Sequence, residues 1–137
     1  MGEFDYVPGV LGQLGIKQIF HKVSQKPGQP FWFGIAKKGK PVFALPGNPV
    51  STQICAFRYV IPYLRKASGL EVKQEYIAIH DKINIQSDLT QFLPVAQGHL
   101  VPIGGSGDFV ALAQADGFIE YDSHKNQSLW PYFSWQV

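Results

Sequence analysis

The first part of the chain combines one helical pattern with three strand-like ones. Within residues 4–14, apolar side chains from Val7 to Leu14 recur with the i, i+3, i+4, i+7 spacing of one helical face. Gly15 ends this predicted helix, because glycine readily adopts the left-handed conformation found just past helix C-termini. Turn residues separate the apolar segments that follow. The pattern predicts these segments as strands over residues 19–23, 31–36 and 42–45.

The clearest predicted element is a helix that begins at Pro49. Asn48 is suited to the N-cap, and Pro49 is suited to the first helical position. The apolar residues that follow are spaced 4, 3, 4 and 3 positions apart and form one seam that reaches Leu64. Gly69 is a suitable end for the helix. Pro62, inside the pattern, predicts a kink or a local break.

Beyond Gly69, short alternating segments replace the helical pattern. Turns separate these segments, and several short strands at such spacing are typical of a small β-barrel or sandwich. We therefore place a domain boundary near residues 69–72. The sequence predicts a mixed α/β part over residues 1–70 and a small all-β barrel domain over residues 71–137. The strands predicted in the second part are residues 72–80, 92–95, 100–103, 110–113, 118–121 and 129–135.

Composition restricts the class of protein. The 137 residues are 45% hydrophobic and 16% charged, with 12 basic and 10 acidic side chains and a net charge of +2. This balance excludes a disordered polar chain, and the absence of a basic run leaves little attraction for nucleic acid. No apolar run approaches the roughly 20 residues of a membrane span. With no recognisable signal peptide and one cysteine, Cys55, the sequence indicates a soluble, cytoplasmic protein without nucleic-acid or membrane partners.

Residues 46–51 suit an anionic ligand. A tight loop leads into a helix N-terminus there, where free backbone N–H groups and the positive end of the helix dipole attract anions. Gly47 allows close approach of the backbone, and Asn48 and Ser51 add polar side chains. The same residues also describe a well-capped helix without a ligand. Both interpretations stay open.

Two further segments offer groups that an oxyanion prefers. Lys26 precedes Pro27 and Gly28, which can hold its charge in place, and Lys22 lies four residues earlier. A solvated lysine beside a turn is the alternative. The glycine-rich residues 104–108 can form an anion-accepting concavity or a flexible hairpin loop. The aspartates and histidines show no metal-binding spacing.

Four motifs occur here in the order in which one known family has them. They are GEFDYVP at residues 2–8, HKVSQKPG at 21–28, LPGNPVS at 45–51, and GSG at 105–107 with LAQADGFI at 112–119. Together they resemble the molybdopterin molybdenumtransferase family, which includes bacterial MoeA and the E domain of gephyrin. The resemblance spans nearly the whole chain.

The resemblance implies that residues 1–70 are half of a molybdopterin-binding α/β domain, and that residues 71–137 are a C-terminal β-barrel domain of the MoeA type. Enzymes of this family insert molybdenum from molybdate into adenylylated molybdopterin, with Mg²⁺ present, and the parent protein is expected to be a homodimer. The resemblance also implies that Asp5 is the catalytic carboxylate and a metal ligand. The implied substrate or anion contacts are Lys22, Lys26, Gly28, Pro46, Gly47, Asn48, Pro49, Ser51, Ser106 and Gly107.

Two features depart from the family pattern. Gln29 stands where the family usually has a second lysine, which removes one positive charge from the proposed molybdate pocket. The chain also begins inside a motif, so we expect a fragment that is inactive without the rest of its parent. The sheet containing residues 42–45 is then expected to expose an edge or an apolar face and to self-associate.

Two other functions are compatible with the sequence. One is a non-catalytic interaction or assembly module, a role that the E domain of gephyrin also has. The other is an oligonucleotide-binding barrel, in which aromatic side chains would stack on bases. The low net charge disfavours the second function. The aromatic residues concerned are Trp130, Tyr132, Phe133 and Trp135.

Overall fold

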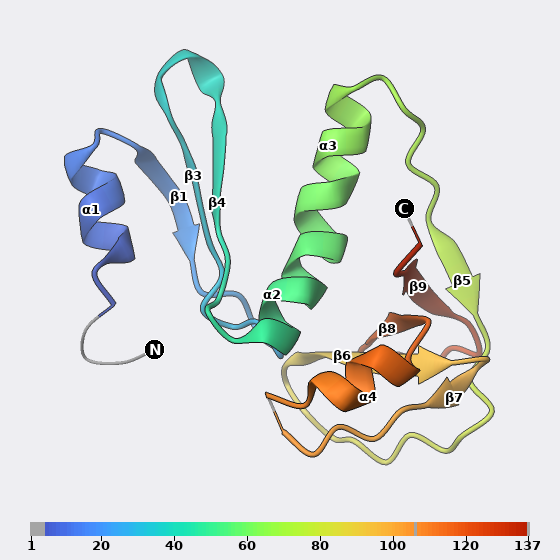
Figure 1. Ribbon diagram of the computed structural model, residues 1–137. Helices are drawn as coiled ribbons and strands as arrows, with labels where there is room; N and C mark the ends of the chain where they lie inside the picture. The colour runs from blue at the N-terminus through green and yellow to red at the C-terminus, as the bar shows by residue number, and fades with distance from the viewer. Residues whose placement is uncertain (1–4, 106, 137) are drawn as a thin grey trace.

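The computed structural model describes residues 5–105 and 107–136. Its first part contains a three-stranded antiparallel sheet (Figure 1). In this sheet β3 (Trp32–Ile35) lies between β1 (Lys17–His21) and β4 (Pro41–Ala44), and the short 3-10 helix η1 (Lys37–Gly39) forms the turn from β3 to β4. Helix α1 (Val7–Gln13) precedes the sheet, and none of its residues is buried.

The predicted elements of this first part are confirmed, with two differences. The strand predicted over residues 19–23 ends at His21, because Lys22 adopts a left-handed φ of 71° that an extended strand does not allow. The apolar stripe of α1 also does not face a core. Val7, Val10 and Leu14 are 50%, 49% and 68% exposed. Helical periodicity predicted the element correctly, but the described chain does not cover its apolar side.

One continuous helical segment follows the first sheet. It consists of α2 (Pro49–Cys55), a π-helical turn η2 (Ala56–Val60) and α3 (Ile61–Ala67). The N-cap prediction is confirmed, because the Asn48 side chain accepts a hydrogen bond from the Ser51 backbone N–H at 3.4 Å. Pro62 has no N–H to donate to the preceding turn, and the wider π-helical turn ends at Val60, just before Ile61 and Pro62 begin α3. The predicted local break therefore takes the form of a π-turn.

A six-stranded sheet fills the second part, with the order β2-β6-β8-β9-β5 and with β7 paired to β6. Strand β2 comes from the first part of the chain and pairs in parallel with β6, Gln25 opposite Thr90. Among the described residues no strand pairing joins β2 to β5, so closure into a barrel is not confirmed. The strands are β2 (Gln25–Lys26), β5 (Glu75–Ile77), β6 (Thr90–Ala96), β7 (His99–Leu100), β8 (Gly117–Tyr121) and β9 (Trp130–Ser134).

The strand predicted over residues 110–113 is wrong. Helix α4 (Phe109–Gln114) occupies this segment, so the second part is not all β. The Asp108 side chain caps the helix by accepting a hydrogen bond from the Ala111 N–H at 3.0 Å. Ala111 and Leu112 are buried, and Leu112 shares a core cluster with residues of α2. Capping and tertiary packing therefore outweigh the short apolar run that favoured a strand.

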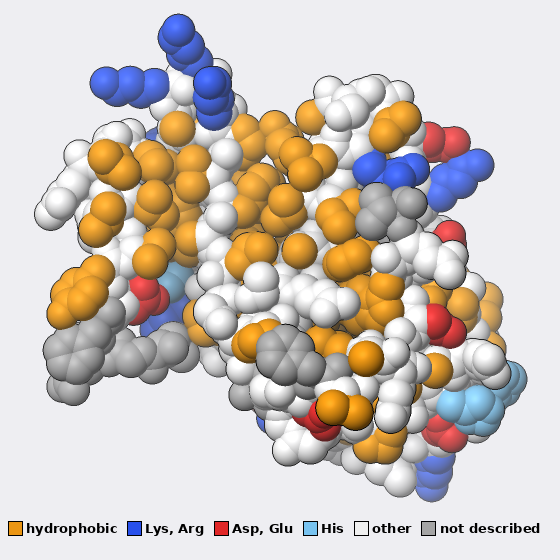
Figure 2. All heavy atoms as spheres, in the orientation of Figure 1, with side chains coloured by type: hydrophobic (Ala, Val, Ile, Leu, Met, Phe, Trp, Pro, Cys, Tyr) orange, Lys and Arg blue, Asp and Glu red, His pale blue; other side chains and the backbone are white. Residues whose placement is uncertain are grey.

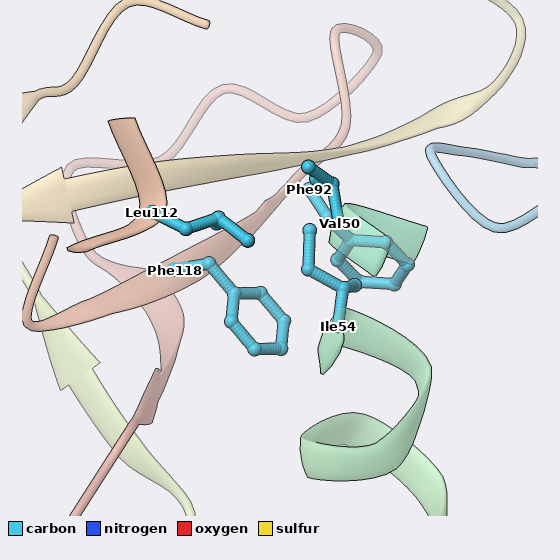
Figure 3. Packing of buried hydrophobic residues seen from close by; sticks show 5 residues of the cluster. All are labelled: Val50, Ile54, Phe92, Leu112 and Phe118. Atoms are coloured by element: carbon cyan, nitrogen blue, oxygen red, sulfur yellow. The ribbon is translucent and has the colours of Figure 1, made fainter. Parts of the chain in front are cut away.

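Two core clusters lie on opposite faces of the second sheet. Successive residues of β8, Phe118 and Ile119, are both 0% exposed and belong to different clusters, as the alternation of side chains along a strand requires. Figure 3 shows the first cluster, in which side chains from α2, β6, α4 and β8 point toward one another. Its members are Val50, Ile54, Phe92, Leu112 and Phe118. Helix α2 is therefore anchored on the second sheet while its N-terminus follows the last strand of the first sheet.

Candidate functional site

A cavity of about 470 Å³ lies where α1, the first sheet and the start of α2 meet. Asp5 contributes from the segment before α1, and Trp32 contributes from β3. Pro46, Gly47, Asn48 and Ser51 contribute from the loop and first turn that begin α2. The structure therefore brings together several of the site residues expected from the sequence. They come from segments far apart in the chain, and the anchored helix α2 fixes one wall of the cavity.

The loop that leads into α2 is held by its own side chains. Thr52 Oγ1 donates to the Pro46 carbonyl and lies 2.9 Å from the Asn48 carbonyl. Asn48 Oδ1 accepts from both the N–H and the hydroxyl group of Ser51. The capped-helix interpretation of residues 46–51 is thus confirmed, and the anion-binding interpretation stays a prediction. A Cβ on Gly47 would meet no atom within 4 Å, so internal packing does not require a glycine at this position.

Asp5 is exposed beside this cavity, and its Oδ1 accepts a hydrogen bond from the Val7 N–H at 3.3 Å. It is the only carboxylate among the described residues that line the cavity. A Mg²⁺ ion prefers several oxygen ligands in octahedral geometry. No group of three or more His, Cys, Asp or Glu side chains in the described part of the chain could hold a metal ion. One carboxylate together with substrate phosphates and water can also hold Mg²⁺, so the expectation that Asp5 is a metal ligand stays a prediction.

Lys22 and Lys26 are exposed and are not among the residues that line the cavity. Lys22 follows the last residue of β1 and has a left-handed φ of 71°. Lys26 lies on β2 opposite Gln91 of β6, and a cis peptide bond joins it to Pro27. The structure thus places the two lysines on the connection between the two sheets. Pro49, the first residue of α2, also does not line the cavity.

Gly28 has a packing role that the sequence did not reveal. Its φ is +98°, and a Cβ there would lie 2.6 Å from Gln25 Nε2 and 2.7 Å from Cys55 Sγ. Gln25 is 1% exposed, accepts a hydrogen bond from the Tyr59 hydroxyl group, and donates to Cys55 Sγ at 3.5 Å and to the Pro27 carbonyl at 3.4 Å. Gln25 therefore connects the lysine-bearing loop, residues 22–31 between β1 and β3, to the helical segment that begins with α2.

Burial governs the titration of this buried network. It raises the pKa of the Cys55 thiol to about 11, partly opposed by the hydrogen bond from Gln25. It also raises the pKa of the Tyr59 hydroxyl group to about 12. Both groups keep their protons near neutral pH, so Tyr59 remains a donor to Gln25 and Cys55 is an unreactive thiol. With an exposure of 0%, Cys55 belongs to the core.

The glycine-rich loop serves as a helix cap in the part that the structure describes. Asp108 accepts hydrogen bonds from the Ala111 N–H at 3.0 Å and from the Gly104 N–H at 2.9 Å. These two bonds, with the first the larger, lower the pKa of the Asp108 carboxyl group. Gly107 is exposed and does not line the cavity. Ser106 lies outside the described residues, so its predicted contact with an anion stays a prediction.

His21 is a cavity residue that the sequence pattern did not single out. It ends β1 opposite Trp32, and both residues line the cavity. Its Nε2 atom is buried and has no hydrogen-bond partner within the described residues. The other histidines lie elsewhere, and two of them contact aspartates, His99 with Asp81 at 3.3 Å and His124 with Asp88 at 3.4 Å. A lone histidine in the sequence gives no signal of this kind, since burial of one ring nitrogen depends on the tertiary fold.

A second cavity of about 570 Å³ lies between α3, the segment after it and β9. Its lining mixes apolar residues with Arg65, Lys73, Glu71 and Glu75. Arg58, which also lines it, is neutralised by Glu120 at 2.7 Å. None of the residues expected to bind substrate, anion or metal lines it, whereas Tyr132 and Phe133, two of the aromatic residues considered for base stacking, do. No helix in the described part of the chain has the length and apolar character needed to cross a membrane.

Comparison with known proteins agrees with the motifs. Residues 1–66 match the family described as a probable molybdopterin binding domain. The molybdopterin molybdenumtransferase of Synechocystis sp. is 36% identical over 148 residues, which covers 98% of this chain and 36% of that protein. Gephyrin of Dictyostelium discoideum is 36% identical over 88 residues, which covers 53% of this chain and 12% of that protein.

Solved structures of related proteins indicate the same family. The molybdopterin biosynthesis MoeA protein of Pyrococcus horikosii superimposes with a TM-score of 0.77 and 31% identity, covering 97% of this chain and 35% of that one. The chain thus spans about a third of the length of the Synechocystis enzyme and of this MoeA protein. Over the residues that it contains, the chain belongs to the molybdopterin molybdenumtransferase family, the family of MoeA and gephyrin.

Proposed function

We propose that this chain is the substrate-binding portion of a molybdopterin molybdenumtransferase, whose parent inserts molybdenum from molybdate into adenylylated molybdopterin. The observation that carries the proposal is the cavity in which Asp5, Asn48 and Ser51 meet. These residues lie in the stretch that matches the probable molybdopterin binding domain. Several weak motifs distant in the chain therefore contribute to one concave site, which is where small-molecule ligands bind.

The cavity suits the organic substrate. Pro46, Gly47, Asn48 and Ser51 would contact molybdopterin, with the amide of Asn48 and the hydroxyl group of Ser51 as its hydrogen-bonding groups. At the edge of the cavity, the Asp5 carboxylate can accept a proton or a hydrogen bond from an N–H group of a bound substrate. Asp5 would also be the protein ligand of a Mg²⁺ ion, as the family resemblance implies, and no step of the reaction is assigned to that ion.

Molybdate would bind beside the lysine-bearing loop. Lys26 and Lys22 supply the positive charge, and Gly28 keeps the loop packed against Gln25 and Cys55. Ser106 and Gly107 of the glycine-rich loop, and Pro49 at the start of α2, are its further proposed contacts. Charge-assisted hydrogen bonds to an oxyanion are worth about 1.5–3 kcal/mol each. Lys26→Ala should therefore weaken molybdate binding about tenfold or more, and Gln29→Lys should strengthen it, most visibly at low salt.

The parent would be a cytoplasmic homodimer with a boundary near residue 70 of this chain and a barrel-type second domain. The chain by itself would bind ligands without turnover, because the cavity contains no lysine or arginine among the described lining residues. A catalytic site needs its charged groups preorganised around the reacting atoms. Assays of the isolated chain should therefore measure binding.

A chimera tests the proposal. The segment of the Synechocystis enzyme that aligns with this chain is replaced by the 137 residues, and the chimera is tested for molybdenum cofactor formation in cells lacking their own molybdenumtransferase. We expect formation with the unchanged segment and its loss with Asp5→Asn. Lys125→Ala, a change at an exposed residue of the β8–β9 connection, is the control and should have no effect. Full activity of the Asp5→Asn chimera would contradict the assignment of the site.

The alternative function is an assembly module of the gephyrin type. The observation that favours it is an apolar surface over α1, the first sheet and α3 (Figure 2). Ile19 is 50% exposed and Leu64 is 53% exposed on these elements. Large exposed apolar areas mark protein contacts. A chimera that dimerises normally yet forms no cofactor would favour this alternative.

A further inference from the structure

We infer that His21 is a ligand-binding residue of the first cavity, and that its Nε2 atom forms a hydrogen bond with the polar edge of a flat, uncharged heteroaromatic ring. The inference deepens the proposed function and rests on it, because the ring concerned would be the pterin ring. Nothing in the sequence motifs assigned a role to His21. The argument starts from the buried nitrogen.

A buried polar atom without a partner destabilises the folded chain, because it has lost its hydrogen bonds to water. His21 Nε2 is such an atom among the described residues, and its residue lines the first cavity. The only other such side-chain atom in the described part is Trp135 Nε1. The Trp135 ring packs on Phe57 and Phe118, and Trp135 lines neither of the two cavities. Of these two atoms in the described residues, the nitrogen of His21 is the one that a ligand in a cavity could satisfy.

The position of His21 is held by the sheet. It is the last residue of β1, and its register partner across the sheet is Trp32. Trp32 is 2% exposed, and its indole N–H donates to Gln18 Oε1 at 2.9 Å. The Lys22 N–H also donates to the Phe31 carbonyl at 2.9 Å directly after His21. The imidazole thus belongs to a fixed wall, where a hydrogen bond to a ligand needs little reorganisation.

The composition of the lining indicates which ligand group His21 meets. The described lining residues include the carboxylate of Asp5 and no lysine or arginine. A molybdate or phosphate group there would meet the negative charge of Asp5 without a lysine or arginine among the described lining residues to neutralise it. Trp32, Leu45 and Pro46 instead give apolar walls, and Asn48 and Ser51 give uncharged polar groups. Apolar walls with a few directed polar groups are typical of sites for flat organic ligands.

The pterin ring fits this set of groups. Its amide-like edge carries both N–H donors and a carbonyl acceptor, which suit a carboxylate, an amide and an imidazole together. Either tautomer of His21 can pair with such an edge, since Nε2 donates in one and accepts in the other. The oxyanion then belongs beside Lys26, outside this cavity. The ring and the oxyanion would bind to different elements.

The test uses the 137-residue chain and two probes, 6-methylpterin for the ring and sodium molybdate for the oxyanion. His21→Phe keeps an aromatic ring of similar size and removes Nε2, so 6-methylpterin binding followed by its fluorescence should weaken about tenfold. Molybdate binding measured by calorimetry should not change. His21→Gln, whose amide can reach a similar point, should restore pterin binding to within about threefold of the unchanged chain. His124→Phe, at a surface histidine, is the matched control and should leave both affinities unchanged.

The stability of the variants distinguishes ligand binding from packing. Removing an unpartnered buried nitrogen should leave the unfolding temperature of His21→Phe equal to or above that of the unchanged chain. Equal pterin affinity in His21→Phe and the unchanged chain would overturn the inference and leave the proposed function standing. Equal loss of binding in His21→Gln and His21→Phe would overturn it as well, because the side chain would then act through shape alone. Absence of pterin binding to the unchanged chain would overturn both the inference and the proposed substrate cavity.

Discussion

The six-stranded sheet packs apolar side chains on both of its faces, whereas the three-stranded sheet leaves much of its apolar surface exposed. On β8, the neighbouring residues Phe118 and Ile119 are both 0% exposed although they point to opposite faces. On β1, Ile19 is 50% exposed and Phe20 is 39% exposed. Both sheets have apolar strands of similar pattern. What differs is whether another element of the described chain covers them.

Aromatic contacts partly replace that cover in the first sheet. Phe31 stacks on Tyr59 with ring centroids 4.8 Å apart, and Phe33 and Phe43 are 5.0 Å apart. Tyr63 of α3 packs on Phe43 at 5.5 Å. Such pairs add about 0.5–1.5 kcal/mol each beyond the burial of their area. They tie the sheet to the helical segment on one side, while Ile19 and the stripe of α1 remain in contact with solvent.

The largest expected effect on stability comes from a substitution in the core of the six-stranded sheet. Phe118→Ala removes a ring that is 0% exposed, and it should lower the free energy of unfolding by about 3–5 kcal/mol. Phe20→Ala, the matched change in the first sheet at a ring that is 39% exposed, should lower it by about 1–2 kcal/mol. Urea unfolding followed by far-UV circular dichroism measures both. Equal effects would show that the two sheets are covered to the same degree.

The next effect tests the connection between the two sheets. Gly28→Ala places a Cβ within 2.7 Å of Cys55 Sγ at a φ of +98°, so it should cost about 1–3 kcal/mol for the backbone alone and more for the clash. Gly47→Ala, where a Cβ meets nothing within 4 Å, is the control and should change stability by less than about 0.5 kcal/mol. Thermal unfolding compares the two variants. A neutral Gly28→Ala would mean that the loop is not packed as described.

A smaller effect should appear in the dependence of stability on pH. The pKa of Cys55 is raised from 9.0 to about 11 in the folded chain. Between these pH values the unfolded chain has lost the thiol proton that the folded chain retains. The free energy of unfolding should therefore fall as pH rises from about 9 to about 11, while the contribution is fully present below pH 9.

Cys55→Ala provides the control for this titration, because it removes the thiol while other groups still titrate. The difference in the free energy of unfolding between the unchanged chain and Cys55→Ala should be constant below pH 9 and should become smaller above it. Urea unfolding at several pH values measures this difference. Parallel curves from pH 8 to pH 11 would contradict the burial of Cys55.

The smallest effect on stability concerns the exposed face of the first sheet. Ile19→Lys, at a side chain that is 50% exposed, should change the free energy of unfolding by less than about 0.5 kcal/mol. It should nevertheless reduce self-association at high concentration, because it places a charge on an apolar contact surface. Leu129→Lys, at a residue that is 51% exposed in the second part, should leave association unchanged. Light scattering that shows monomers for all three chains would contradict an interface on this face.

Local signals in the sequence predicted much of the fold. The N-cap at Asn48, the helix from Pro49 and most strands followed from spacing and turn residues, and the structure has them. Helix α4 was missed because four apolar residues between turns are compatible with a strand or a helix. Only the burial of Leu112 against α2 decides between them. Pairing of β2 with β6 was also missed, since two residues give no periodicity.

The part of the candidate site that comes from sequence motifs could be predicted, and the part that depends on tertiary packing could not. Asp5 and most of the LPGNPVS segment line one cavity, whereas Lys22, Lys26 and Pro49 do not line it. Sequence order cannot show that the β1–β3 connection turns toward the second sheet through β2. It also cannot show that one ring nitrogen of His21 is buried without a partner. Both are consequences of tertiary packing.

The most direct test of the central claim, that the first cavity is the substrate site, is a nuclear magnetic resonance titration of the isotope-labelled chain with 6-methylpterin. The account predicts saturable shifts of the backbone amide signals of Gly47, Asn48 and Ser51 and of the His21 ring signals. The amide signals of Arg65 and Lys73, in the larger second cavity, should remain in place. Shifts confined to Arg65, Lys73 and their neighbours, or no shifts at saturating pterin, would contradict the account.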